Sequence, residues 1–129
     1  VINIRGHRIG SEEIESIVLR IKEIYECCAI SIINELEGHV IYLFVVSKDN
    51  NLNNKISKKI VSNFGTFALP KEIYYISELP KTRSGKILRR LLRSILINPH
   101  SKNYGDLSTM LNSQIIHEIK DKINHNDQN

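Results

Sequence analysis

The chain has no tryptophan, three prolines and only two cysteines among its 129 residues. Two cysteines are too few for the disulfide framework that holds small secreted domains together. The pair is adjacent, at Cys27 and Cys28, and neighbouring residues of a strand point to opposite faces, which disfavours a disulfide between them. We therefore expect a reducing compartment, the cytoplasm first. The nucleus or an organelle stays open because the sequence begins at Val1 without a methionine.

Long apolar runs are also absent. No window approaches the roughly 18 apolar residues that cross a bilayer, and the first residues lack the basic-then-apolar pattern of a signal peptide. We therefore expect no membrane partner. Apolar residues make up 41% and charged residues 25% of the chain, which is ordinary for a globular protein with one modest core.

The apolar patterning predicts a small α+β domain in which helices pack on a short mixed sheet of three strands. We expect strands over residues 28–33, 40–46 and 72–76. The middle segment is a continuous apolar run rich in β-branched residues, which is typical of a buried strand. With the first strand it suggests a hairpin at the centre of the sheet.

Four stretches with apolar residues at helical spacing predict helices. Ser11 can cap the first, and Gly65 ends the second, whose residues Ile56, Ile60, Val61 and Phe64 should face the core. The third carries an apolar stripe from Ile87 to Leu96 before Pro99, and the last carries isoleucines from Ile115 to Ile123.

The segment Leu79–Ile87 places a lysine, Lys86, on a turn rich in Pro, Ser and Gly. It is not a Walker phosphate loop, because Pro80 stands where the first glycine belongs and Ile87 follows the lysine. Residues 81–93 hold six basic side chains and no acidic one, which would attract an anion. They are Lys81, Arg83, Lys86, Arg89, Arg90 and Arg93.

Three motifs carry a family resemblance. PKTRSGK followed by ILRR (residues 80–90) resembles the C-terminal signature of adenylate-forming acyl-CoA synthetases. GHRIGS (residues 6–11), followed by Glu13 and Glu15, is similar to the motif just after the interdomain hinge of that family. GDLSTM (residues 105–110) resembles the tail of acetyl-CoA synthetases. The three motifs occur in the expected order.

The resemblance implies the mobile C-terminal domain of a two-domain ligase over residues 1–98, followed by a tail with a short helix over residues 99–129. The chain would start just beyond the hinge, and the large N-terminal domain of the same polypeptide would be its partner. The implied enzyme is an acetate–CoA ligase that makes acetyl-adenylate from acetate and ATP and passes the acetyl group to CoA. This chain alone is expected to be inactive.

The resemblance also implies site residues. Lys86 would be catalytic, stabilising charge where the acetate carboxylate meets the α-phosphate. Arg8 would bind the ATP or adenylate phosphate, and its planar fork suits that role. Gly6 and Arg5 would contact CoA, although Arg5 stands where acetyl-CoA synthetases commonly have serine. Lys58 and Lys59 are the nearest substitutes for a family arginine near Val61.

No metal ligands are predicted within the chain. Residues 117–121 begin like an HExxH zinc motif but end in Asp121, and the histidines and cysteines show no ligand spacing. The resemblance implies that ATP with Mg is held mainly by the N-terminal domain. It also marks Lys86 as a candidate for regulatory acetylation, with a lysine acetyltransferase and a deacetylase as further partners.

Three alternatives remain. The first is a ligase for propionate or another short acid. It would differ from an acetate–CoA ligase only in the acyl pocket, which would lie in the N-terminal domain. A nucleic-acid-binding module could use the basic segment, but no aromatic residue is interleaved with its cations. A stand-alone interaction domain is the least favoured.

Overall fold

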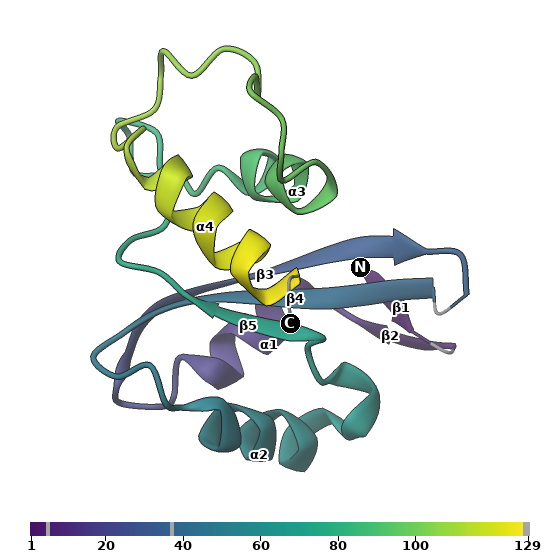
Figure 1. Ribbon diagram of the computed structural model, residues 1–129. Coiled ribbons are helices and arrows are strands. Elements are labelled where there is room, and N and C mark those ends of the chain that lie inside the picture. Colours follow the sequence, from purple (N-terminus) through teal and green to yellow (C-terminus); the bar gives the residue numbers. More distant parts are fainter. Residues whose placement is uncertain (5, 37, 128–129) are drawn as a thin grey trace.

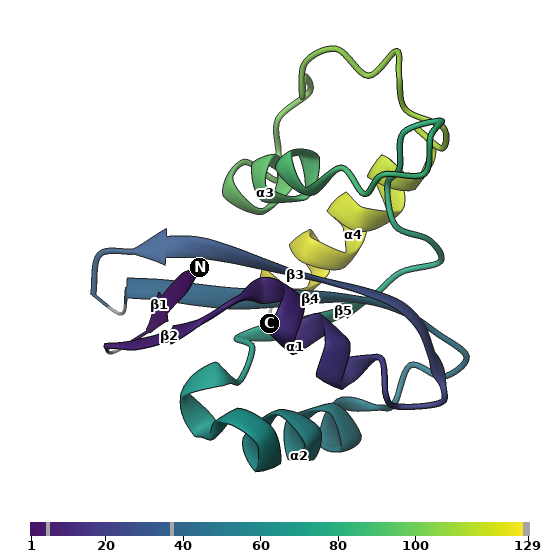
Figure 2. The same ribbon diagram turned by 180° about the vertical axis from the view of Figure 1, so that it is seen from behind.

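The computed structural model describes residues 1–4, 6–36 and 38–127. Along the chain it contains β1 (Ile2–Ile4), β2 (His7–Ile9), α1 (Ser11–Val18), β3 (Ile24–Asn34), β4 (Gly38–Ser47), α2 (Asn53–Phe64), the 3-10 turn η1 (Thr66–Ala68), β5 (Glu72–Tyr75), α3 (Arg89–Ile97) and α4 (Ile115–Asp127). Helices lie on both sides of one sheet (Figures 1 and 2). None of the helices in the described part of the chain has the length and apolar character needed to cross a membrane.

The sheet is mixed and has five strands, with β4 at its centre. β4 pairs antiparallel with β3 from Asn34↔Gly38 to Ile24↔Ser47, and its other edge pairs parallel with β5 over Tyr42–Val45. The first residue of β4 also meets β1, which pairs with β2. The mixed character confirms the prediction, but the predicted count of three strands is wrong. β1 and β2 have three residues each, too few to show an alternation in the sequence.

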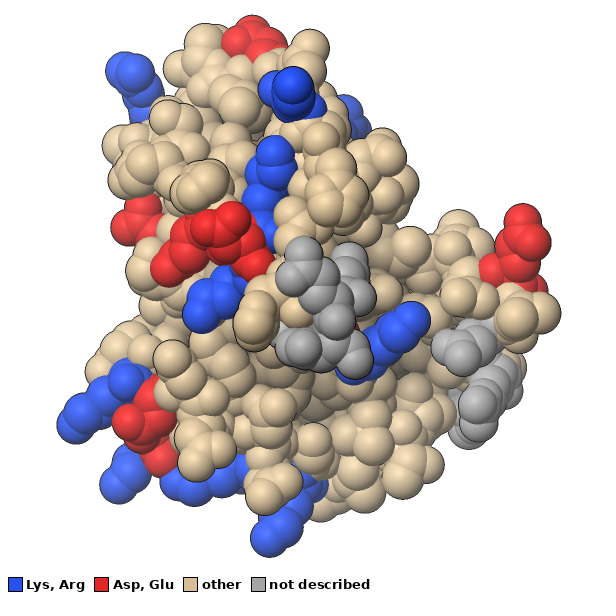
Figure 3. Space-filling view, viewed as in Figure 1, with Lys and Arg blue, Asp and Glu red and all other residues tan. Residues whose placement is uncertain are grey.

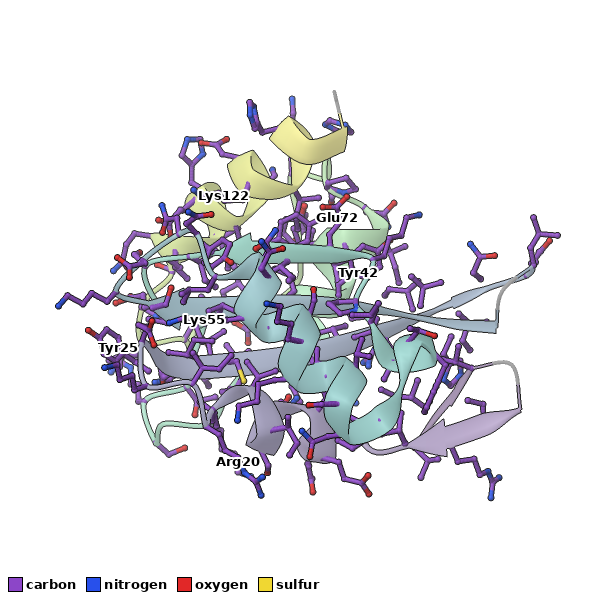
Figure 4. All side chains as sticks on the ribbon, turned by 90° about the horizontal axis from the view of Figure 1, so that it is seen from below. Arg20, Tyr25, Tyr42, Lys55, Glu72 and Lys122 are labelled. Atoms are coloured by element: carbon purple, nitrogen blue, oxygen red, sulfur yellow. The ribbon has the colours of Figure 1, made fainter. Side chains whose placement is uncertain are left out.

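Two separate cores lie against the two faces of the sheet. Ala29, Leu43 and Val45 point to the face covered by α1 and α2, whereas Ile30, Phe44 and Tyr74 point to the face covered by α3 and α4. Seen from below, α2 lies in front of the sheet and α4 along its far margin (Figure 4). Because both faces are covered, β4 is apolar along most of its length rather than alternating.

The two cysteines follow the same alternation. Cys27 belongs to the core under α1 and α2, and Cys28 to the core under α3 and α4. Both are buried free thiols, as their adjacency in the sequence predicts.

The helices differ from the sequence predictions at two boundaries and in the burial of one residue. Ser11 is the first residue of α1, and the N-cap position is Gly10. Val61 of α2 is 38% exposed, while Ile56 and Ile60 of the same helix are fully buried. α3 begins only at Arg89, because Ile87 pairs in an isolated bridge with Lys81 instead of entering the helix.

Candidate active site

Lys86 lies near the end of a tight hairpin, residues 81–87, which we call the Lys86 hairpin. A bridge between Lys81 and Ile87 closes its base. The Thr82 amide donates to the Lys86 carbonyl (2.9 Å), and the Gly85 amide donates back to the Thr82 carbonyl (2.9 Å). The Thr82 hydroxyl accepts from the Lys86 amide (3.1 Å). Gly85 adopts φ 93°, a conformation that L side chains rarely take, which explains a glycine before the lysine.

The Lys86 side chain is exposed, and its ammonium has no ion-pair or hydrogen-bond partner among the described residues. Other cations of the basic segment are engaged within the domain. Lys81 pairs with Glu26, Arg89 with Glu15, and Arg93 Nε donates to the Ser31 carbonyl (3.4 Å). The basic segment, residues 81–93, therefore has fewer cations available for a ligand than its sequence indicates. Lys86 is one of those that stay available.

The chain after the hairpin is anchored by a bidentate ion pair. Arg89 Nη1 donates to Glu15 Oε2 (2.7 Å) and Nη2 donates to Oε1 (2.9 Å). Glu15 Oε2 also accepts from the Ala29 amide of β3 (2.8 Å), and Arg89 Nη1 lies 3.3 Å from Cys28 Sγ. The hydrogen bonds that Arg89 donates to Glu15 raise the pKa of the Arg89 guanidinium. This cluster ties α1, β3 and α3 together and fixes the start of α3, three residues beyond Lys86.

The GDLSTM motif lies directly against the Lys86 hairpin. The Arg83 amide donates to the Thr109 carbonyl (3.2 Å), and the Leu111 amide donates to the Lys81 carbonyl (2.8 Å). Between them, Thr82 and Met110 form an antiparallel bridge. The Ser108 amide donates to Asp106 Oδ1 (2.9 Å), and this hydrogen bond lowers the pKa of the Asp106 carboxyl. Two of the three sequence motifs therefore form one structural unit.

The GHRIGS motif forms the turn and second strand of the β1–β2 hairpin. Gly6 has φ 85°, and a Cβ built on it would meet nothing within 4 Å, so the glycine serves the turn itself. Arg8 is exposed and donates from Nε to Asn3 Oδ1 (3.2 Å), while the Asn3 amide donates to His39 Nδ1 (2.9 Å). Arg5 lies outside the described residues.

Lys86 and Arg8 are not brought together. The strand β2, which carries Arg8, and the teal-to-green stretch between β5 and α3, which carries the Lys86 hairpin, lie at opposite sides of the molecule in both Figure 1 and Figure 2. A single small ligand cannot contact both ends of this domain in one orientation.

A second basic surface lies over α2. Lys58 and Lys59 line a shallow groove with Lys22 and the floor residue Ile21. Basic side chains gather along this lower edge in Figure 3, where Figure 1 places α2. Lys55, labelled in Figure 4, borders the groove and pairs with Glu23.

Sequence reasoning missed two groups of contacts around the hairpin, those of Glu15 and those of Asn112. Glu15 was noticed only as part of a motif, and its partner lies 74 residues away. Asn112 follows the GDLSTM motif by two residues and gave no signal of its own. The contacts of Glu15 and of Asn112, the latter described below, join residues that are far apart in the sequence. A single sequence does not reveal such pairs.

The chain belongs to the AMP-binding enzyme C-terminal domain family, whose sequence profile matches residues 13–86. Similar curated proteins are acetyl-coenzyme A synthetases. The protein from Coprinopsis cinerea is 39% identical over 95% of this chain and 20% of its own length, and that from Penicillium chrysogenum is 37% identical over 92% of this chain and 18% of its own. Acetyl-coenzyme A synthetase 2 from Pseudomonas putida is 37% identical over 95% of this chain and 20% of its own. The chain thus spans about a fifth of the length of these relatives.

Solved structures agree on the fold. An acyl-CoA synthetase from Brucella canis superposes with a TM-score of 0.69 at 27% identity, covering 78% of this chain and 20% of that one. Acetoacetyl-CoA synthetase from Streptomyces lividans gives a TM-score of 0.73 and covers 97% of this chain and 19% of that one. At 22% identity the second likeness shows the fold alone.

Proposed function

We propose that this chain is the C-terminal domain of an AMP-forming acetate–CoA ligase. Its partners would be a large N-terminal domain in the same polypeptide and the substrates acetate, ATP and CoA. The names of the curated relatives support acetate as the acid, and their length supports the larger polypeptide. The GDLSTM tail, which the sequence analysis associates with acetyl-CoA synthetases, agrees with that choice.

The observation that carries this proposal is the unpaired ammonium of Lys86 on a braced hairpin. In the proposed first half-reaction, an acetate oxygen attacks the α-phosphorus of ATP, and the bond to pyrophosphate breaks. Two anions must approach each other, so a cation placed between them lowers the barrier. An exposed lysine without a carboxylate partner can enter a site on another domain and give its charge entirely to the substrate.

The β1–β2 hairpin would serve the second half-reaction. There the CoA thiol attacks the acyl carbon of acetyl-adenylate, and AMP leaves. We propose that Arg8 holds the phosphate, a role for which its single hydrogen bond to Asn3 leaves other donors available. Gly6 and Arg5 would border the CoA path. Because Arg8 and Lys86 lie at opposite ends, the domain would rotate between the two steps.

Magnesium would be held outside these residues. Across the described ranges, no three His, Cys, Asp or Glu side chains gather in a way that could hold a metal ion. We propose that the N-terminal domain holds the Mg of MgATP. Lys86 is also our candidate for control by a lysine acetyltransferase and a deacetylase, because acetylation would remove the charge that the first step needs.

The test is the Lys86→Ala variant of the intact ligase. Acetate-dependent ATP–pyrophosphate exchange should fall by at least about a hundredfold, the scale at which a positioned charge contributes. Acetyl transfer from preformed acetyl-adenylate to CoA should stay within about twofold of the parent enzyme. Arg83→Ala, on the same hairpin, is the matched control and should leave both steps nearly unchanged. Normal exchange in Lys86→Ala would refute the proposal.

A further inference from the structure

The Lys86 hairpin and the segment that leads into it are held by the end of the GDLSTM motif and by residues that follow it. Glu118 of α4 accepts hydrogen bonds at Oε2 from the Ser77 amide (3.0 Å) and hydroxyl (2.9 Å). The backbone contacts of Thr109 and Leu111 hold Arg83 and Lys81, as described above. In Figures 1 and 2 the chain before α4 returns to the hairpin from across the molecule.

Asn112 lies at the centre of this contact. Its side-chain Nδ2 donates to Glu78 Oε1 (2.8 Å) and to the Leu79 carbonyl (2.9 Å), and its Oδ1 accepts from the Lys81 amide (3.1 Å). The residue is only 7% exposed. One buried amide therefore uses its N–H donors on Glu78 and Leu79, just before the hairpin, and its oxygen on Lys81, the first residue of the hairpin.

These contacts, together with the backbone contacts of Thr109 and Leu111, restrain the base of the hairpin. Lys81 is the first residue of the base, so fixing its amide fixes the direction from which Lys86 projects. The backbone carbonyl of Asn112 separately accepts a hydrogen bond from the amide of Ile115, the first residue of α4 (3.0 Å). A substitution of the side chain consequently removes the brace but keeps the backbone contact.

We propose that Asn112 is a positioning residue for Lys86 in adenylation, an inference that rests on the proposed function. Catalytic groups must be held close to their productive geometry, and a misplacement of about 1 Å can cost on the order of a hundredfold in rate. The Asn112 amide adds this restraint at the base of the hairpin, whose lysine ammonium has no ion-pair or hydrogen-bond partner within the described part of the chain. The β1–β2 hairpin at the opposite end does not depend on it.

The experiment measures both half-reactions in the intact ligase. Asn112→Ala should slow ATP–pyrophosphate exchange roughly ten- to a hundredfold and leave acetyl transfer from preformed acetyl-adenylate within about twofold. Retention of the second step shows that the variant is folded. Asn124→Ala is the matched control, since this partly buried asparagine of α4 contacts the Pro99 carbonyl (3.4 Å) and not the hairpin. It should leave both steps unchanged.

A charge exchange tests the geometry directly. Asn112→Asp places a carboxylate against Glu78 and should slow exchange, because two acceptors then face each other. Adding Glu78→Gln supplies an N–H donor from the other side and should restore part of the rate, because the Leu79 carbonyl still faces the new carboxylate. A double variant no faster than Asn112→Asp would overturn the inference, as would an equal loss of both half-reactions in Asn112→Ala or an unchanged exchange rate.

The Lys86→Ala variant distinguishes a failure of the proposed function from a failure of the positioning role of Asn112. If it exchanges pyrophosphate normally, the proposed function itself fails. If it is inactive in exchange while Asn112→Ala is normal, only the positioning role of Asn112 fails.

Discussion

Arg89 places its two terminal nitrogens on the two carboxylate oxygens of Glu15, 74 residues earlier in the chain, at 2.7 and 2.9 Å. The Glu15 side chain is 10% exposed and that of Arg89 39%. The pair bridges α1 and α3 beside β3, which lies at the edge of the sheet next to β4. It also bonds the Ala29 amide, so a polar group of the β3 backbone is satisfied by a side chain.

Removal of Arg89 should therefore destabilise the fold. Arg89→Ala leaves a largely buried carboxylate without its cation, and we expect a loss of about 2–3 kcal/mol in the free energy of unfolding, below the usual range for a buried pair because Arg89 is partly exposed. Arg90→Ala removes an exposed neighbour and should stay within about 0.5 kcal/mol. Urea unfolding measures both. Equal stability of the two variants would contradict the anchoring role.

Acetylation of Lys86 should stop adenylation selectively. The modification removes the positive charge but leaves the backbone hydrogen bonds of the hairpin in place. Protein carrying acetyl-lysine only at position 86 should lose ATP–pyrophosphate exchange and regain it after enzymatic deacetylation. Protein acetylated only at the exposed Lys58 is the control. Full exchange activity with Lys86 acetylated would contradict the assigned role.

Gly6 should resist substitution for a conformational reason. At φ 85° an alanine is strained, although a Cβ there has free space, so we expect Gly6→Ala to cost about 1 kcal/mol. Gly10→Ala is the comparison, because Gly10 has φ −84° and ψ 142°, which alanine adopts readily. Thermal unfolding should separate the two variants by several degrees. In the intact ligase, Gly6→Ala should slow acetyl transfer to CoA more than adenylation.

Both cysteines should be unreactive in the folded chain. Burial raises the pKa of the Cys27 and Cys28 thiols from 9.0 to about 12, so little thiolate exists near neutral pH. Iodoacetamide labelling followed by mass spectrometry should show slow modification that becomes fast in urea.

The same shift has a pH consequence. The folded chain holds its thiol protons while the unfolded chain releases them, so the contribution to stability is complete below pH 9 and is lost as the pH rises toward 12. The decline above pH 9 should be shallower in Cys27→Ala/Cys28→Ala. A decline of the same slope in that variant would contradict this account.

Much of the fold follows from local patterns. The apolar run of β4 and the helical spacing of Ile56 and Ile60 are properties of short segments, and both predictions are confirmed. β1 and β2 were missed as strands of the sheet because three residues carry no periodicity and their pairing depends on distant partners. Val61 was assigned to the core because its spacing fits, but α2 exposes that side to solvent.

The candidate site also has features that the local sequence predicts and features that it does not. Ser84 and Gly85 indicated a turn that presents Lys86 to solvent, and in the structure this turn is part of a hairpin, which was not predicted. The roles of Lys86, Arg8, Arg5 and Gly6 stay predictions, as does the boundary at residue 98. The brace by Asn112 was beyond the reach of the sequence, because an isolated asparagine is more often a turn residue than a buried hydrogen-bonding hub.

The Asn112 contact can form only late in the synthesis of the chain. Lys81 leaves the ribosome 31 residues ahead of the amide that fixes it, so a growing chain carries its lysine hairpin unsupported for that interval. The sheet and α3 can form earlier, from residues already released. Most of the sheet can thus pair before the reactive loop is held in place, and truncation upstream of residue 112 would remove both this contact and α4, which buries Ile115, Ile119 and Ile123 against one face of the sheet.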